Sequence, residues 1–328
     1  MRLGLRAWIA TLALATPLAA HAANCTSQAE LQGQDRNALA AIAQRLSVAV
    51  LQQDYSTLQS LLFPAIASDW DGIHNEVDLG APLVKGGQPQ IQAIYLLDAS
   101  MQTAPADTQF FCSNSTGSLT VTVNMHALPP GKYAFILVSA AGAPLGGQLG
   151  FVVVWDPTGA TPSWKLGGVS VRQGILDGHD GVWYWTRARA LAATGQPWSA
   201  WYSYAMARYL LLPVDFISSP NMEKLNHEQS QINGGPGDFP ISVSEGQRTW
   251  RIDAINVDTS LREPDLAVTY ESLGITDPAA QRTEAVAVLG ALLKAHPDLR
   301  ENFHGLWAYA SKDGKVTPVM ELPMSQIK

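Results

Sequence analysis

Apolar positions near the start of the chain recur first at helical spacing and then at strand spacing. Four of them share one face of a helix that Asp35 caps: Leu39, Ile42, Leu46 and Val50. A second helical pattern covers residues 55–67, and Pro64 bends it. The sequence therefore predicts an N-terminal helix pair.

Six strand-like runs follow this pair, divided by turn signals rich in Gly and Pro. The runs are residues 91–100, 108–114, 118–128, 132–140, 148–156 and 163–172. Two helices followed by a meandering, curved antiparallel sheet predict an α+β domain over residues 23–173.

The helix pair, the late strands and the segment 152–171 (VVVWDPTGATPSWKLGGVSV) resemble a nuclear transport factor 2-like domain. The resemblance covers less than half of the chain and implies a cone in which the sheet curls around a helix, often leaving an apolar pocket. Residues 128–140 (LPPGKYAFILVSA) also fit a strand pair of an immunoglobulin-like or transthyretin-like sandwich. We favour the cone because two helices precede the strands.

Enzymes of the cone family use a Tyr together with an Asp or a His inside the pocket. Tyr95, Asp98 and His126 lie on strand-like runs and are candidates for such positions. None of them matches a motif of the family, so the resemblance assigns no role to them.

Helical spacing returns in residues 177–213, which hold four of the ten Trp residues and four Tyr residues. Small residues and Tyr204 resemble the pattern of a single tetratricopeptide hairpin, whereas Arg187 stands where that family prefers Leu. The matching positions are Ala188, Gly195, Ala200, Tyr204 and Ala207. A lone hairpin over residues 174–231 cannot bury its apolar face, so it has to dock on a neighbouring domain or on an external partner.

The aromatic residues of this hairpin have two interpretations. Most of the rings have the spacing of core residues, but Trp198, Trp201 and Tyr202 around the turn are predicted to mark a ligand or partner surface, together with His179. The neighbouring Asp180 is interpreted as a helix N-cap rather than as an acid–base partner of His179.

The last part of the chain predicts a second α+β unit. Residues 232–240 (INGGPGDFP) are a linker, and residues 248–258 and 265–273 follow as strands. Asp277 begins a helix that ends before Pro297, and a hairpin turns at Lys312-Asp313-Gly314. We therefore expect a ββαββ unit over residues 241–328.

The first residues predict export. Residues 1–22 have the basic start, the short apolar run and the Ala20-His21-Ala22 motif of a signal peptide that is cut between Ala22 and Ala23. The apolar run is too short to cross a bilayer, and no other segment predicts a membrane span. We expect a periplasmic or secreted protein in which Cys25 and Cys112 form a disulfide.

The charge balance disfavours nucleic-acid binding. The chain has a net charge of −7, and loss of two Arg with the leader leaves 19 basic against 28 acidic residues, or −9. Such a chain gains nothing from a phosphate backbone.

No metal site or cofactor is predicted. Five ionisable residues gather in an acidic segment: Asp69, Asp71, His74, Glu76 and Asp78. Their spacing does not match a calcium loop, and we interpret the segment as a solvated loop. Residues 226–231 (NHEQSQ) lack the second His of a zinc-protease helix.

These observations favour an exported bacterial envelope protein that binds an unknown protein or small molecule, or acts as a scaffold, without catalysis. One alternative is a small-molecule enzyme of the isomerase or hydrolase kind that uses the cone pocket. A purely structural envelope component is the other. No catalytic constellation carries the enzyme alternative, so the binding protein is the leading hypothesis.

Overall fold

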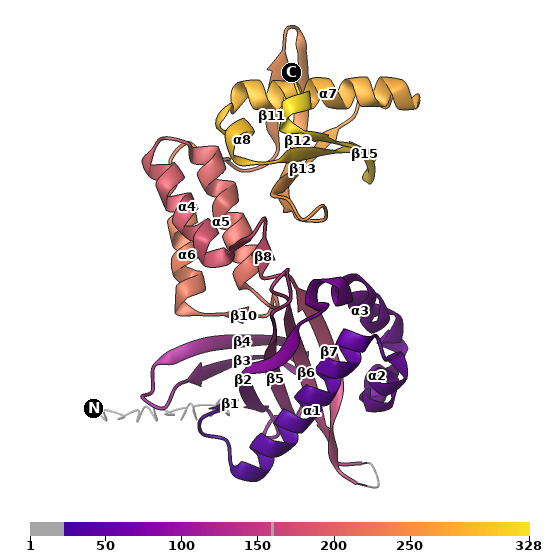
Figure 1. Ribbon diagram of the computed structural model, residues 1–328, viewed down its shortest axis with the longest axis vertical. Coiled ribbons are helices and arrows are strands. Elements are labelled where there is room, and N and C mark those ends of the chain that lie inside the picture. The colour runs from indigo at the N-terminus through magenta and orange to yellow at the C-terminus, as the bar shows by residue number, and fades with distance from the viewer. Residues whose placement is uncertain (1–22, 159–160) are drawn as a thin grey trace, which may run out of the picture.

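The computed structural model describes residues 23–158 and 161–328, and it confirms the α+β class. Three parts follow one another along the long axis (Figure 1): the first domain (residues 23–173), the helical unit (174–231) and the C-terminal domain (241–328). The predicted signal peptide, residues 1–22, lies outside the described residues. No helix in the part of the chain that the structure describes is long and apolar enough to cross a membrane.

The N-terminal helices are interrupted where Pro64 begins a new turn. Helix α1 (Gly33–Gln52) buries the predicted apolar face, and α2 (Tyr55–Leu61) begins at Asp54, whose carboxylate accepts a hydrogen bond from the Thr57 amide at 3.0 Å. The sequence predicted one bent helix here. Instead α2 ends at Leu61 and Pro64 opens the 3₁₀ helix η1 (Pro64–Asp69), because proline suits a first helical turn and not an interior one.

The acidic segment is helical, so its interpretation as a solvated loop was wrong. Helix α3 (Trp70–Val84) buries Ile73, Val77 and Val84 on one side, whereas Asp71 and Asp78 are exposed on the other. A Cβ atom added to Gly80 would lie 2.2 Å from the Cβ of Val171, so this helix packs against the sheet with no spare room. The apolar spacing of α3 decides its fold, and its acidic residues lie on the more exposed side of the helix.

Two sheets make up the rest of the first domain. The larger has the strand order β1-β2-β5-β6-β7 and is antiparallel throughout; its strands are β1 (Asn24–Ser27), β2 (Gln88–Asp98), β5 (Lys132–Ala141), β6 (Gln148–Asp156) and β7 (Ser163–Arg172). The smaller has the order β10-β4-β3; its strands are β10 (Ile217–Ser218), β4 (Leu119–Leu128) and β3 (Ala106–Ser113).

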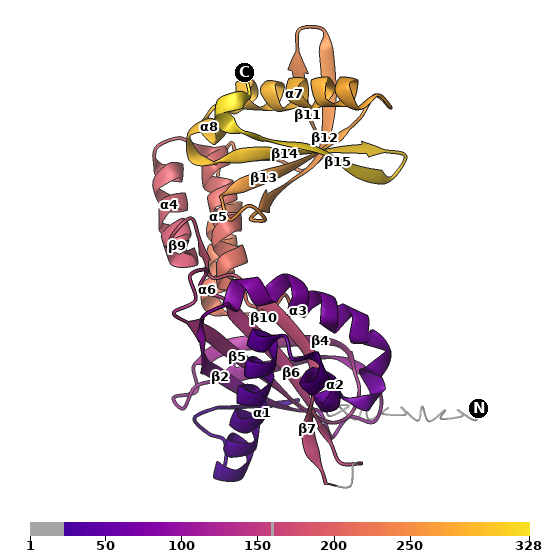
Figure 2. The same cartoon turned by 45° about the vertical axis from the view of Figure 1, so that its right-hand side comes forward.

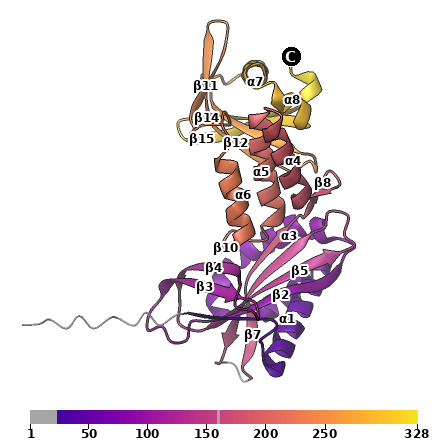
Figure 3. The ribbon, with the colours of Figure 1, turned by 90° about the vertical axis from the view of Figure 1, so that its left-hand side faces the viewer.

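Each face of the larger sheet is covered differently. Helices α1 to α3 pack on one face around Leu39, Leu46 and Phe151, and the small sheet packs on the other around Phe110 and Phe135. Figure 3 shows the β3–β4 hairpin beside β2, away from α1. Strands β4 and β5 follow each other along the chain but belong to different sheets. This arrangement does not decide between the cone family and a sandwich family, so membership of either stays a prediction.

The predicted disulfide is confirmed. Cys25 of β1 is bonded to Cys112 of β3, across 87 residues of sequence. The bond joins the edge of the larger sheet to the smaller sheet, and Cys112 is fully buried.

The helical unit contains one helix more than the predicted hairpin. After the short strands β8 (Ile175–Leu176) and β9 (His179–Asp180) come α4 (Gly181–Ala193), α5 (Pro197–Leu211) and α6 (Pro220–Ser230). The Asp180 carboxylate accepts a hydrogen bond from the Trp183 amide at 2.8 Å, which confirms the N-cap interpretation. Ala188, Ala200 and Ala207 are fully buried, as the crossing of two helices requires.

The C-terminal domain is a five-stranded sheet with helices on one face (Figure 2). The strand order follows the chain: β11 (Ile241–Glu245), β12 (Arg248–Asp258), β13 (Asp265–Glu271), β14 (Gly305–Lys312) and β15 (Lys315–Pro323). Helices α7 (Pro278–Ala295) and α8 (Asp298–Asn302) connect β13 to β14, the one parallel pair within this described sheet. The structure adds β11 and α8 to the predicted ββαββ unit and confirms the Asp277 cap and the turn at Asp313-Gly314.

Removing the disulfide is expected to destabilise the first domain. In Cys25→Ser the free energy of unfolding should fall by up to about 4 kcal/mol, because the unfolded chain is released from a long loop. Denaturant unfolding of the oxidised protein measures this loss. Cys25 is the cleaner position to change, because a Ser at the fully buried Cys112 would also bury a hydroxyl. Reduced wild-type protein is the control and should match the variant; oxidised and reduced wild type of equal stability would refute the expectation.

Candidate functional site

Two of the predicted surface residues are buried inside the protein. Trp198 and Tyr202 are 6% and 2% exposed and belong to the apolar core of the C-terminal domain. The indole of Trp198 stacks on His296 with 3.5 Å between ring centroids, and Tyr202 meets the edge of Phe303. Their prediction as an accessible contact surface was wrong, because the partner of these rings is the chain's own C-terminal domain.

Polar contacts fix the same junction. The Ser199 amide donates to the Asp298 carboxylate at 2.9 Å, and the Ser199 hydroxyl donates to the Asp298 carbonyl at 2.7 Å. One N–H of Arg187 donates to the amide oxygen of Asn302 at 2.9 Å. The helical unit is therefore held to α8 by both apolar and hydrogen-bonded contacts.

The other two predicted residues lie apart from this pair. Trp201 is half-buried and lines a depression of about 480 Å³ between α5 and β12, together with Arg208 and Tyr209. His179 stacks on Trp183, 3.7 Å between ring centroids, at the far end of α4 from the turn that precedes Trp198. The structure does not bring the four predicted residues together into one surface.

The three cone-pocket candidates are not gathered either. Tyr95 stacks on Phe135, whereas Asp98 accepts hydrogen bonds from Ser100 at the end of β2. The side chain of His126 is 91% exposed, so it cannot point into an interior pocket. The candidate catalytic set of the cone alternative is therefore not assembled.

A groove that the sequence analysis missed lies where the first domain meets the helical unit. It has a volume of about 560 Å³. Its walls are mainly apolar and come from both parts: Leu119, Val121 and Leu137 on the strands, and Val182, Trp185, Leu211 and Met222 on the helices. Uncharged polar groups lie along the rest of the lining: Thr120, Gln148, Ser218, Ser219 and Asn221.

Two large apolar side chains of this groove are open to solvent. Val182 on α4 is 56% exposed and Leu119 on β4 is 37% exposed. They come from different parts of the chain and line the same concavity. Apolar groups that remain exposed within a concave surface are typical of ligand-binding sites.

The contacts around the groove hold its shape. Residues Ile217 and Ser218 pair with Val123 and Thr122, so β10 of the helical unit becomes a strand of the first domain's small sheet. The side-chain amide of Gln148 on β6 donates to the Leu210 carbonyl at the end of α5, at 3.0 Å. Both links tie the two walls together, so the groove is preformed.

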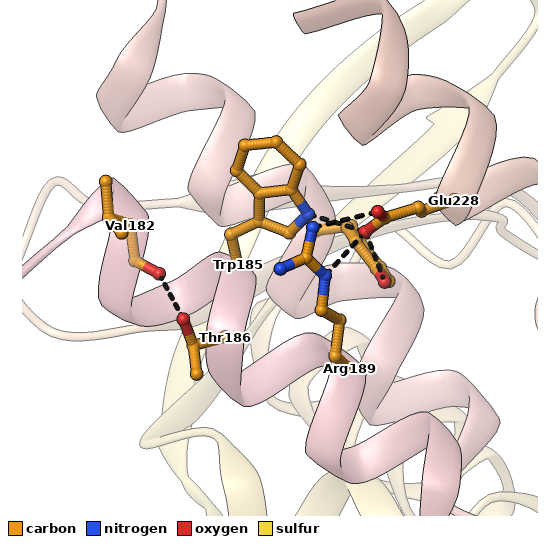
Figure 4. A network of polar contacts seen from close by, with 6 residues as sticks. Val182, Trp185, Thr186, Arg189 and Glu228 are labelled. Atoms are coloured by element: carbon orange, nitrogen blue, oxygen red, sulfur yellow. Dashed lines mark hydrogen bonds and ion pairs between the residues drawn. The ribbon is translucent and has the colours of Figure 1, made fainter. Parts of the chain in front are cut away.

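A carboxylate on α6 positions the helical wall (Figure 4). Glu228 accepts hydrogen bonds from the Trp185 indole at 2.7 Å, from two nitrogens of Arg189 at 2.8 Å each, and from the Tyr204 hydroxyl at 3.2 Å. The Arg189 guanidinium also lies over the Trp185 ring, 4.6 Å from its centroid. Trp185, which lines the groove, is therefore fixed on two sides.

The hydrogen bonds from Arg189, with a further one from Trp185, lower the pKa of Glu228 to about 2. The carboxylate is charged at neutral pH and four donors satisfy it. Because both oxygens of Glu228 accept hydrogen bonds from Arg189, this carboxylate is not free to act as the general base of a zinc protease. The missing second His of residues 226–231 already argues against that interpretation.

The acidic segment does not form a calcium loop. On α3 the Glu76 carboxylate accepts a hydrogen bond from the Val171 amide at 2.7 Å, and Asp78 accepts one from the Tyr55 hydroxyl. His74 lies 3.5 Å from Asp78. These side chains attach α3 to its neighbours, and helical geometry does not supply the loop that a calcium site of this kind needs.

A scan against protein-family models finds no match to this chain, and searches of curated proteins and of solved structures return none. The resemblances to the nuclear transport factor 2-like and tetratricopeptide families thus stay predictions. Function has to be argued from the groove and its surroundings.

Glu228→Gln tests the network behind the groove. We expect the free energy of unfolding at pH 7 to fall by about 2 kcal/mol, because the variant removes charge-assisted hydrogen bonds. The folded-state pKa of about 2 lies below the ordinary value of 4.5, so the stabilisation is complete above about pH 4.5 and is lost as the pH falls toward 2. Denaturant unfolding at pH 7 and pH 3 measures both effects.

Glu223→Gln is the matched control, since it removes the same charge from the same helix at an exposed position. It should change stability by less than about 1 kcal/mol. Equal effects of the two substitutions would show that the network does not stabilise the helical unit.

Proposed function

We propose that the protein is a binding protein that holds a small, mainly apolar molecule in the groove between the first domain and the helical unit. The observation that carries this proposal is the exposure of two apolar side chains, Leu119 and Val182, one on each wall of the groove. The pairing of β10 with β4 and the hydrogen bond from Gln148 to Leu210 hold these walls in a fixed position. Without a ligand, this apolar surface stays in contact with water, which is unfavourable.

The size and polarity of the groove define the class of ligand. Its volume of about 560 Å³ falls within the range of small-molecule sites, roughly 300–1,000 Å³. None of the described residues that line it is charged. A ligand that fits would be apolar over most of its surface, with a neutral polar group, such as a hydroxyl, carbonyl or amide, to meet the Ser, Thr and Asn side chains.

The same lining supports binding over catalysis. General acid–base chemistry needs an ionisable side chain within hydrogen-bond reach of the reacting atom. The lining residues described above offer hydroxyls and amides and no carboxylate, imidazole or amine. The small-molecule enzyme alternative has no corresponding observation in its favour.

We further propose that the protein works outside the cytoplasm. The Cys25–Cys112 bond supports this location, because structural disulfides persist in oxidising compartments. The binding role and the location are independent proposals. Either one can fail without the other.

Val182→Asp tests the groove with Nile red, a neutral apolar dye whose emission rises and shifts to the blue in an apolar site. We expect one saturable site per chain in the wild type and at least tenfold weaker binding in the variant, because a charged side chain would have to lose water against the ligand. The variant should fold, because Val182 is exposed and an acidic residue suits the first turn of α4.

Val316→Asp is the control, since Val316 is 52% exposed and lies on β15, away from the groove. It should bind the dye as the wild type does. Unchanged binding in Val182→Asp, or an equal loss in both variants, would overturn the assignment of the site. Native mass spectrometry of protein from its own host should show a small-molecule adduct; a co-purified protein in its place would favour a protein partner.

A further inference from the structure

Three potential metal ligands meet on the face of the C-terminal sheet that α7 does not cover. Asp265 begins β13, His304 immediately precedes β14, and Glu321 lies on β15 opposite Trp307. One ligand atom from each of the three residues lies within 4.8 Å of the other two. The cluster is remote in sequence from every residue of the groove.

The carboxylates of this cluster are fully or partly buried. Asp265 is fully buried; its Oδ1 lies 3.0 Å from Nδ1 of His304, and its Oδ2 accepts a hydrogen bond from the Trp307 indole at 3.3 Å. Oε1 of Glu321 is also buried, and it has no hydrogen-bond partner among the described residues. An unpaired carboxylate oxygen beside a second carboxylate is costly unless a proton or a cation joins it.

The backbone brings these groups together. A Cβ atom on Gly305 would lie 2.7 Å from Oε1 of Glu321 and 3.2 Å from Oδ1 of Asp265, so both carboxylates lie directly against this glycine. The His304 amide donates to the Pro264 carbonyl at 3.0 Å, and the His304 carbonyl accepts from the Met324 amide at 2.8 Å. His304 is therefore held between β13 and the end of β15.

We propose that Asp265, His304 and Glu321 bind one divalent transition-metal ion of the Zn²⁺ class. A metal at about 2.0–2.2 Å from each oxygen and nitrogen fits ligand atoms that are already this close, with small adjustments of the side chains. One imidazole with two carboxylates favours Zn²⁺ or Mn²⁺ over Ca²⁺ and Mg²⁺, which prefer oxygen ligands alone. The proposal does not depend on the proposed function of the groove.

Three protein ligands leave at least one coordination position for water or another molecule. The His304 side chain is 41% exposed, so the cluster has a path to solvent. The ion would stabilise the folded state by linking β13, the start of β14 and the edge strand β15.

Isothermal titration of the purified full chain with Zn²⁺ tests the site. We expect one ion per chain in the wild type, and at least tenfold weaker binding in Glu321→Gln and in His304→Gln. His126→Gln is the matched control, because His126 and Asp107 form a second His–Asp pair, 3.4 Å apart, that is exposed. It should bind Zn²⁺ as the wild type does. Ca²⁺ and Mg²⁺, titrated in the same way, should bind far more weakly.

A thermal melt with and without Zn²⁺ supplies the second readout. The midpoint should rise in the wild type and in His126→Gln and stay constant in His304→Gln, which changes a partly exposed side chain and is expected to fold even if Glu321→Gln does not. Absence of a stoichiometric site in the wild type would overturn the proposal. So would full Zn²⁺ binding in His304→Gln, or an equal loss in His126→Gln.

Discussion

Most of the surface of helix α5 is buried against other parts of the chain, and the arrangement of the whole protein depends on this constraint. Nine of its 15 residues are buried, and they cover all sides of the helix except the one that carries the exposed Arg208. Trp198 and Tyr202 enter the core of the C-terminal domain, whereas Tyr204, Met206 and Leu210 pack within the helical unit. A helix with buried residues on most of its circumference has to be covered by several neighbours. The helical unit therefore connects the two domains instead of extending from one of them, and its contact with β4 and β6 creates the groove.

Glu228 and Glu321 are two partly buried carboxylates, and the cost of burying each charge is offset in a different way. Glu228 has a donor for each oxygen, from Arg189, Trp185 and Tyr204, so it stabilises the helical unit as a charged group. Glu321 lies beside Asp265 and lacks a donor to Oε1 among the described residues. The first site is complete within the chain, and the second requires a proton or a cation from outside. This difference separates a structural network from a candidate metal site.

The features that could be predicted from the sequence are those that local chemistry decides. The caps at Asp180 and Asp277, the turn at Asp313-Gly314 and the pairing of two cysteines each depend on a few neighbouring residues or on the compartment. Helix α3 was missed because its closely spaced acidic residues suggest a solvated loop, although the apolar residues at helical spacing decide its fold. The direction in which Trp198 docks, the groove, and the meeting of Asp265 with His304 across 39 residues depend on tertiary packing. No spacing in the sequence encodes those contacts, because each partner is supplied by a distant element.

Hydrogen–deuterium exchange of α5 tests most directly the account in which this helix is the shared core of a preformed junction. Amides in cooperatively buried elements exchange only when the surrounding structure opens. The account predicts that the amides of α5 beyond its first turn, residues 201–211, exchange as slowly as those of β5 and β6 in the first domain. Exchange of α5 at a rate far above that of these strands would contradict it, because the helical unit would then open independently and the groove would not be preformed.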